Sequence, residues 1–476
     1  MLTAGRTDVL LLVNAITGQF IAGLATRIFV VSLPTIAAAL NADILAVSWA
    51  LIAYQLAGIS LSIVFGRLGD IHGRYAIYGG GFAVMTVSSL LCGLAPGVGW
   101  LIAFRLAQGI GAAMIASAAR VLAMDAMPEG AEGRANGFMT MSFHGGVLLG
   151  PPVGGLLIDV LSWRWTFFLL VPIGVAGLAL TALRARGRRQ APAAASTSVD
   201  YVGAALLVVL TGVLALLVDQ RSAEAIGIGQ QNVMVVAFAL GLVGFLAHQR
   251  RAVNPVLNLA LFRIRMFAFS VLSLLAYAIT SGVLTFVLPF YIQNVLHLSP
   301  SFMGLLFLSA PVLTMSLAPV AGQLTDRIGP RFPASLGLAM IMAAFGLGLL
   351  LQVDSHWLLP ALVLAGTGLG QGFFNTPNQT AIIGSVPREY RGFATGLVQM
   401  MFGVGSLLGI SLGGLLLTVM FRHYAGIPGA TPSAEVPGPF VAAMRATFAA
   451  CLVLMTLALA ASFMRGGRRV EAAALH

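Results

Sequence analysis

Positively charged or titratable side chains interrupt three long apolar runs of this chain. Arg27 and Arg105 lie inside two of the runs, and His144 lies inside a third. A charge within an apolar span is expensive to bury and usually has a functional role, and histidine titrates near neutral pH. We therefore expect Arg27, Arg105 and His144 to act in charge selection or coupling. Arg120, near the end of the helix that carries Arg105, is expected to reach the membrane interface.

The other residues that could do chemistry argue against an enzyme. We find no Ser/His/Asp, phosphate-loop or metal-ligand arrangement at a useful spacing. Cys92 and Cys451 both fall in apolar runs, which disfavours a disulfide or a metal site. None of the 15 acidic residues falls in the middle of a run, although proton-driven export of cations normally uses a buried carboxylate. We expect no catalytic residue, no cofactor and no metal.

The composition predicts that these residues are held by membrane-spanning helices. Of the 476 residues, 59% are hydrophobic and only 9% are charged, which is too little charge for a soluble surface. A helix needs roughly 20 apolar residues to cross a bilayer, and such runs predict an all-α polytopic protein with fourteen spans. The predicted spans are 9–40, 44–65, 76–95, 100–123, 135–158, 164–183, 201–218, 231–247, 267–292, 302–323, 333–352, 357–381, 393–420 and 440–464.

The placement of the arginines predicts the orientation. The net charge is +11, but the basic residues lie in short gaps between runs rather than on one soluble face, which disfavours nucleic-acid binding. Cytoplasmic loops carry an excess of basic residues. We therefore expect both termini to be cytoplasmic in a bacterial inner membrane, with the chain in contact with lipid. We also expect a monomer. Only four arginines are then expected at outer ends of spans: Arg164, Arg221, Arg422 and Arg445.

A short pattern occurs once in each half of the chain. The segment 66–73 (GRLGDIHG) recurs as 322–329 (GQLTDRIG), with its matching residues at one constant offset. Repeats of this kind are typical of secondary transporters. Because the offset covers eight predicted spans, we expect two six-helix bundles at 1–190 and 251–476, separated by two additional spans at 191–250.

The chemistry of this repeat predicts a gate. Its aspartate can accept hydrogen bonds from a helix N-terminus, and the arginine that follows can pair with a carboxylate or a lipid phosphate. We expect each copy to form a latch in a short cytoplasmic loop. The expected gating residues are Gly66, Asp70, Gly73, Arg74, Gly322, Asp326 and Arg327.

Taken in order, the motifs resemble the major facilitator superfamily, and within it the fourteen-span drug:proton antiporter group. Segment 66–74 is similar to the family's loop between the second and third helices, 101–111 to its fourth-helix motif, and 146–155 to its fifth-helix antiporter motif. Further segments look like the fourteen-span subgroup: 163–165, 172–174, Asn254-Pro255 and 288–293. The resemblance covers nearly the whole chain. It implies export of amphipathic small molecules by alternating access, coupled to protons.

Two sets of residues are expected to shape the transport path. Small residues four apart in the fifth-helix motif let another helix approach closely, and a proline there can kink the helix. This set is Gly146, Gly150, Pro151, Gly154 and Gly155. Polar and aromatic residues within spans are expected to line a substrate cavity, with the NTPN sequence at 375–378 breaking its helix. This second set is Gln19, Tyr54, Gln55, Gln108, Tyr277, Phe286, Phe290, Gln371, Asn375 and Asn378.

The chain departs from the family in its first helix. Ala25 occupies a position that is commonly acidic in the family, and Arg27 follows it. Two unpaired guanidinium groups in a low-dielectric cavity repel a lipophilic cation. Besides a proton-coupled multidrug-type exporter, an organic-anion or lipid carrier that uses Arg27 and Arg105 therefore stays open. A non-transporting membrane receptor is disfavoured, because the chain has no long soluble segment.

Overall fold

The computed structural model describes residues 7–42, 44–128, 130–185, 200–218, 228–252, 255, 257–298, 300–426 and 436–465. All regular structure within these ranges is helical. Arg221 and Asn254, which the sequence analysis singled out, lie outside the described residues.

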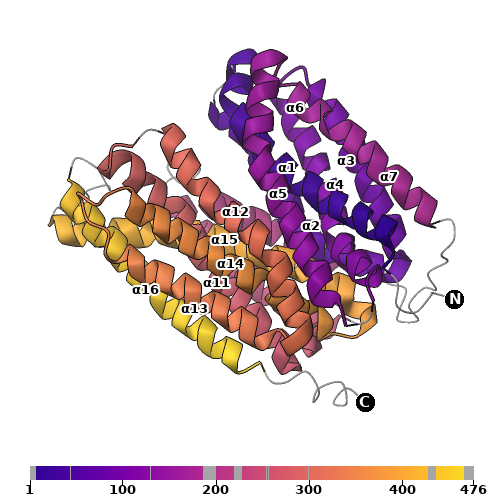
Figure 1. Ribbon diagram of the computed structural model, residues 1–476. Helices are drawn as coiled ribbons and strands as arrows, with labels where there is room; N and C mark the ends of the chain where they lie inside the picture. The colour runs from indigo at the N-terminus through magenta and orange to yellow at the C-terminus, as the bar shows by residue number, and fades with distance from the viewer. Residues whose placement is uncertain are drawn as a thin grey trace.

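The helices form two groups that are successive in the chain (Figure 1). The N-terminal group contains α1 (Val9–Ala39), α2 (Ile44–His72), α3 (Arg74–Gly93), α4 (Val98–Asp125), α5 (Glu132–Val160), α6 (Trp165–Phe168) and α7 (Leu170–Ala185). The C-terminal group contains α11 (Arg265–Phe290), α12 (Pro300–Ile328), α13 (Arg331–Gly348), α14 (Leu358–Gly384), α15 (Arg391–Ala425) and α16 (Pro437–Phe463), with the short turns η1 (Leu259–Arg263), η2 (Tyr291–Val295) and η3 (Arg388–Tyr390).

Two further helices connect the groups in the chain, α8 (Tyr201–Val218) and α10 (Ile228–Arg251). Helix α8 packs against α2, α15 and α10, and the hydroxyls of Ser60 and Thr211 share a hydrogen bond across the α2–α8 contact. Asp200 at the start of α8 accepts hydrogen bonds from Gln249 and contacts His248, so it ties α8 to α10. The extra pair therefore contacts both groups through α8.

In the part of the chain that the structure describes, twelve helices are long and apolar enough to cross a membrane. The predicted count of fourteen spans is therefore not confirmed. The apolar part of α8 is short, Val202–Leu214, and α14 is not among the twelve. Helix α14 packs between α12 and α13, and this protein contact accommodates polar residues that lipid would not. It also runs unbroken through Pro377, so the expected break at 375–378 is wrong.

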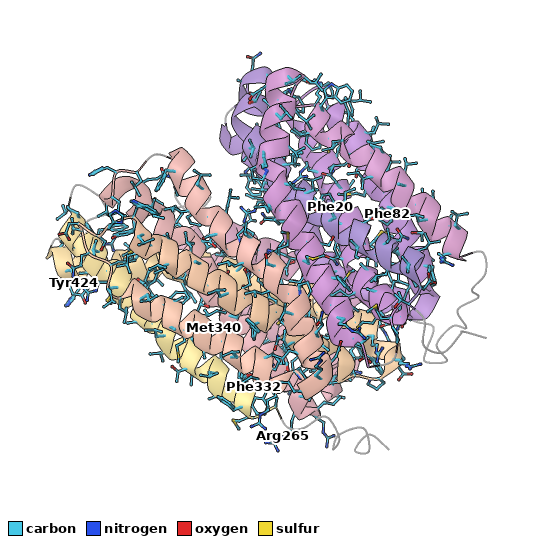
Figure 2. All side chains as sticks on the ribbon, viewed as in Figure 1. Phe20, Phe82, Arg265, Phe332, Met340 and Tyr424 are labelled. Carbon is cyan, nitrogen blue, oxygen red and sulfur yellow. The ribbon has the colours of Figure 1, made fainter. Side chains whose placement is uncertain are left out.

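Side chains fill the interior of each group (Figure 2). Phe82 is fully buried within the N-terminal group, whereas Phe332 and Tyr424 project from the C-terminal group and are 60% and 48% exposed. Apolar residues on the outer faces are expected when lipid is the solvent, because burial inside the protein is not needed to keep them from water.

The two groups contact each other through paired helices. Helix α5 packs against α12, and α2 packs against α15. The glycines show where along the helices these contacts lie. Every described glycine that contacts the other group is in the half of its helix nearest one and the same membrane face. They are Gly66, Gly133, Gly137, Gly145, Gly322, Gly392, Gly396 and Gly403. We call the membrane face at this end the latch face.

Towards the other face, the glycines of α5 and α15 that have close neighbours meet only their own group. Gly150 and Gly154 of α5 meet α1, while Gly409 and Gly413 of α15 meet α11. The helical groups accordingly diverge at the ends remote from the marked chain termini (Figure 1). The structure is thus held together at the latch face and parted at the other.

Candidate transport path and gates

Asp70 caps a helix of the opposite group. Its two carboxylate oxygens accept hydrogen bonds from the backbone N–H groups of Gly392 and Phe393, at 3.1 and 3.0 Å. These residues begin α15, where backbone N–H groups lack partners within the helix and the helix dipole favours a negative charge. Only 1% of the Asp70 side chain is exposed, so water screens this contact little.

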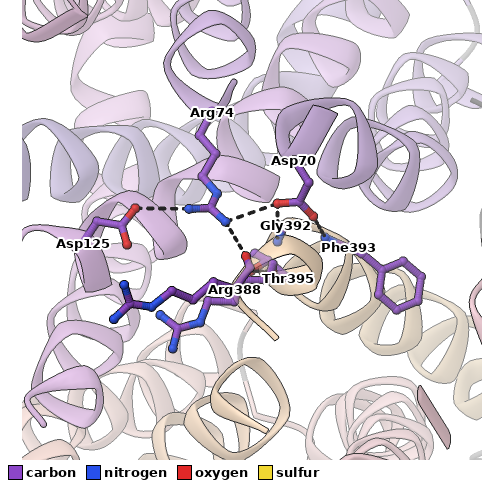
Figure 3. A network of polar contacts seen from close by, with 8 residues as sticks. Asp70, Arg74, Asp125, Arg388, Gly392, Phe393 and Thr395 are labelled. Carbon is purple, nitrogen blue, oxygen red and sulfur yellow. Dashed lines mark hydrogen bonds and ion pairs between the residues drawn. The ribbon is translucent and has the colours of Figure 1, made fainter. Parts of the chain in front are cut away.

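Arg74 joins both groups at the same point (Figure 3). Its guanidinium pairs with Asp70 at 3.3 Å and with Asp125 of α4 at 3.2 Å. It also donates a 2.7 Å hydrogen bond to the backbone carbonyl of Arg388 in the C-terminal group. One arginine therefore holds the Asp70 carboxylate in place and itself crosses between the groups.

Asp326 makes the reciprocal contact. Its carboxylate accepts hydrogen bonds from the backbone N–H groups of Gly133 and Arg134, at 2.7 and 3.1 Å. These residues lie in the first turn of α5. The Arg134 side chain pairs with Asp326 at 3.3 Å, and 11% of the Asp326 side chain is exposed. Each group thus supplies one aspartate that caps a helix of the other.

Two glycine pairs make these caps possible. A Cβ added to Gly66 would strike the backbone carbonyl of Gly392, and one added to Gly133 would strike that of Gly322; the reverse additions clash as well. Backbones can approach this closely only when both residues lack side chains. Gly73 and Gly329, which follow the two aspartates, have positive φ angles of 98° and 84° and end α2 and α12 in the left-handed region that favours glycine.

The latch differs in detail from its prediction. Asp70 and Asp326 lie in the last turns of α2 and α12 rather than in a loop, because their carboxylates must reach along the membrane face to the facing helix start. Arg327 is exposed and makes no ion pair within the described residues, where Arg134 pairs with Asp326 instead.

No motif described above predicts the partner residues at the starts of α5 and α15. A second repeat marks them. Gly133, Ala135 and Gly137 match three residues of α15 at one constant offset. The matching residues are Gly392, Ala394 and Gly396.

The fifth-helix motif packs against α1. A Cβ on Gly146 would meet the backbone of Phe20 and Leu24, and one on Gly150 would lie 2.8 Å from Cβ of Arg27. Gly154 faces Ile28 in the same way, whereas Gly155 has open space around its Cβ position. Helix α5 continues through Pro151.

Arg105, a predicted charge-selection residue, is enclosed by neighbouring side chains in this structure. Its guanidinium lies between the rings of Phe29 and Tyr54, with Cζ 4.3 and 4.2 Å from the ring centroids. It donates to the Ala50 carbonyl at 3.3 Å and to Gln108 Oε1 at 2.6 Å, and it is fully buried. These contacts hold α1, α2 and α4 together. They also place Tyr54 and Gln108 in the bundle interior rather than in a cavity.

Arg27 and His144 do not share the fully enclosed surroundings of Arg105. Arg27 is exposed, although it lies near the middle of α1. The His144 ring on α5 is within electrostatic range of the charges of Arg27 and Arg120. Arg120 is only 5% exposed and therefore does not reach the interface as expected.

In the C-terminal group, Tyr277 is the centre of a polar and aromatic cluster. Its hydroxyl accepts from Gln371, which in turn accepts from Thr314 at 3.0 Å. Its ring lies 5.0 Å from Phe374 and 6.2 Å from Phe402, centroid to centroid. The structure thus brings Tyr277 and Gln371 together.

The other residues predicted to line a substrate cavity do not lie together. Gln19 and Asn378 are fully buried, Asn375 is 7% exposed, and the Asn378 amide donates to the Ser270 carbonyl. Gln55 and Phe290 are exposed, and Phe286 stacks on Phe290. We therefore keep Tyr277 and Gln371 as the C-terminal candidates. No cluster of metal-ligating side chains was found in the part of the chain that the structure describes.

Comparison with known proteins agrees with this architecture. The chain is 32% identical to multidrug resistance protein Stp of Mycobacterium tuberculosis (strain CDC 1551 / Oshkosh) over 422 residues, covering 87% of this chain and 76% of that protein. It is 32% identical to the uncharacterized transporter YebQ of Escherichia coli (strain K12), covering 83% and 85%. The human organic anion transporter MFSD10 has a similar fold, with a TM-score of 0.67 at 13% identity over 96% of this chain and 99% of that one.

A family profile covers most of the chain as well, matching residues 15–367 and 269–474. Its matches include both aspartate latches, the fifth-helix glycines and the C-terminal cluster. The profile describes transporters, which agrees with the gate geometry and with the curated relatives. This chain belongs to the Major Facilitator Superfamily and is a multi-pass secondary transporter.

Proposed function

We propose that this transporter exports amphipathic small molecules across the bacterial inner membrane by alternating access, energised by the proton motive force. The observation that carries the proposal is the reciprocal capping by Asp70 and Asp326 at one face only. Carriers of this kind rock two helical bundles about a site near the membrane midplane. The two caps join the bundles at one end of that motion and must break for the other.

The caps also give the motion two discrete states. When the latch face opens, the starts of α5 and α15 lose their carboxylate partners. Hydrogen bonds to a charged group contribute about 1.5–3 kcal/mol each, so the closed latch is stabilised by several such terms. A substrate or an ion that binds the open form must offset them, which is how binding at the midplane controls the gate.

The latch face is the cytoplasmic one in this proposal. Arg74, Arg134 and Arg388 all lie there, as the excess of basic residues on cytoplasmic segments requires. Both termini are then cytoplasmic. We also propose that the chain works as a monomer of two bundles, 1–190 and 251–476, with 191–250 as the additional pair. The structure is then the outward-facing state.

The export of several amphipathic compounds is proposed from the relatives named for multidrug resistance, such as the Mycobacterium tuberculosis protein. Proton coupling is assigned to His144. It is the titratable group nearest the middle of α5, and its Nδ1 has no hydrogen-bond partner within the described residues. A histidine is a side chain that can gain and lose a proton during a transport cycle.

Transport by purified protein in proteoliposomes tests the proposal. An imposed pH gradient and membrane potential are applied with one lipophilic cation and one amphipathic anion as alternative cargoes. Gradient-dependent movement of at least one cargo is expected, and a protonophore must abolish it. Movement of neither cargo, by protein shown to be folded and correctly inserted, would remove export as the function.

A further inference from the structure

Two arginines and a histidine lie on three helices of the N-terminal group that pack against one another, and none of the three has an acidic partner among the described residues. They come from three helices, Arg27 from α1, Arg120 from α4 and His144 from α5. The charges of Arg27 and Arg120 both act on the His144 ring. Neither arginine makes an ion pair or a hydrogen bond among the described residues. The cluster therefore carries uncompensated positive charge.

Several polar nitrogens of this cluster are buried and unused. Among the described residues, Nε and Nη1 of Arg120 and Nδ1 of His144 have no hydrogen-bond partner. Arg120 is 5% exposed, so bulk water does not replace the missing acceptor. Burying a donor without an acceptor is costly, and more so for a charged group. Arg105 is better satisfied, because two aromatic rings, a carbonyl and an amide contact its guanidinium, and among the described residues only its Nη2 lacks a partner. The cluster thus lacks an acceptor that carries negative charge.

The cluster lies where a cargo would bind. Gly146, the midpoint of α5, packs on Phe20 and Leu24 of α1, so His144 is level with this part of α1. Gly145 follows His144 on α5, and a Cβ there would lie 3.5 Å from Met315 of the C-terminal group. The described glycines further along α5 meet α1 or open space. His144 therefore lies where the two groups part. Arg27 lies one turn beyond Leu24 on α1 and is an exposed residue. A charge in hydrocarbon is costly, so we place this side chain in the water-filled path.

We propose that Arg27, Arg120 and His144 form the headgroup site for an amphipathic organic oxyanion. This assignment rests on the proposed function and names its substrate class. The exposed Arg27 meets the anion first, and the buried donors of Arg120 and His144 complete its coordination. Guanidinium groups bind carboxylates and phosphates through paired, charge-assisted hydrogen bonds. A lipophilic cation is repelled by the same groups.

The assignment accounts for the absence of carboxylates from the middle of the predicted spans. An exporter of cations needs an acid there that exchanges a proton for cargo. An anion that leaves the cell carries negative charge outwards, and the inside-negative membrane potential drives that movement directly. The proton motive force therefore energises export without an intramembrane carboxylate.

Equilibrium binding tests the site. Purified full-length protein in phosphatidylcholine nanodiscs is titrated with 11-(dansylamino)undecanoic acid and with its methyl ester, which has the same apolar body and no charge. We expect the acid to bind at least about tenfold more tightly than the ester. Arg27→Gln and Arg120→Gln should each reduce that preference about tenfold, whereas Arg445→Gln, an exposed arginine of α16, should leave it unchanged.

Two further measurements distinguish a lipid phosphate from a free amphipath and keep the test valid if one variant does not fold. Replacing half of the phosphatidylcholine by phosphatidylglycerol weakens acid binding more in the wild type than in Arg27→Gln if a lipid phosphate is the natural occupant, and weakens it equally in both, by surface repulsion alone, if a free amphipath is. Arg27 is exposed, so Arg27→Gln decides the matter if Arg120→Gln does not fold. Equal affinity for acid and ester, or an undiminished preference in folded Arg27→Gln, would overturn the site. Because no gradient is applied, a failure of transport would not affect this result.

Discussion

Replacing Asp70 by asparagine should shift the protein away from the state described here. The substitution keeps the size of the side chain and one acceptor oxygen. It removes the charge that Arg74 pairs with at 3.3 Å and turns the second oxygen into an NH₂ group that faces a backbone N–H. Losing one hydrogen bond to a charged group is worth about 1.5–3 kcal/mol. Since 1.36 kcal/mol is a factor of ten, the balance between the two gate states should move about 13- to 160-fold.

Distances between spin labels measure this shift. Leu161 at the end of α5 and Leu305 in α12 are 53% and 64% exposed and lie on the face opposite the latch. Labels on cysteines at these positions, with Cys92 and Cys451 replaced by serine, should give mainly the longer distance in the otherwise wild-type protein. Asp70→Asn should transfer population to a shorter distance.

Asp354→Asn is the matched control for this test. Asp354 is an exposed aspartate between α13 and α14, so Asp354→Asn removes the same charge without touching the latch. Its distance distribution should equal that of the wild type. The reasoning is refuted if Asp70→Asn and Asp354→Asn give the same distribution.

Three other predictions use different parts of the structure. Gly150→Leu should lower stability by about 1–3 kcal/mol and abolish transport, because its Cβ would lie 2.8 Å from that of Arg27, whereas Gly155→Leu meets open space and should behave as wild type; thermal unfolding and flux assays compare the two. Although partial burial opposes it, the hydrogen bonds from His248, Gly203 and Gln249 hold the pKa of Asp200 below its ordinary value. This stabilising contact is therefore present above about pH 3.9, the ordinary aspartate pKa, and lost as pH falls further. Hydrogen exchange should show α8 loosening from α10 in that acidic range but not at pH 7, and unchanged protection would contradict the assignment. Reporter fusions after Arg188 and after Arg469 should both read cytoplasmic, and an external signal from either would reverse the proposed orientation.

The sequence predicts the helical architecture well because lipid leaves few alternatives. A backbone in hydrocarbon must satisfy its own hydrogen bonds, so each apolar run becomes a helix. The number of spans is harder to obtain from composition alone. Helix α14 carries Gln371, Asn375 and Asn378, and it packs among α11, α12 and α13, so its polarity reflects neighbours that the sequence does not reveal.

For the latch and the arginines as well, the sequence does not reveal which residues of other helices surround a given side chain. The repeat around Asp70 and Asp326 predicts two carboxylates that accept from helix starts, but which helices they cap depends on the approach of α15 to α2 and of α5 to α12. Position along the chain suggests that Arg105 faces cargo and that Arg120 reaches the interface. Their actual surroundings come from other helices, Phe29 and Tyr54 around Arg105, and no pattern within α4 reveals them.

The most direct test of the account measures transport in proteoliposomes with and without both latches. Wild-type protein and the Asp70→Asn/Asp326→Asn variant are reconstituted at equal density, and uptake or release of the dansylated acid is followed under an imposed proton motive force. The account predicts gradient-dependent movement by the wild type and its loss in the variant, with binding of the acid retained. Movement at the wild-type rate by the double variant would contradict a gate closed by reciprocal helix caps.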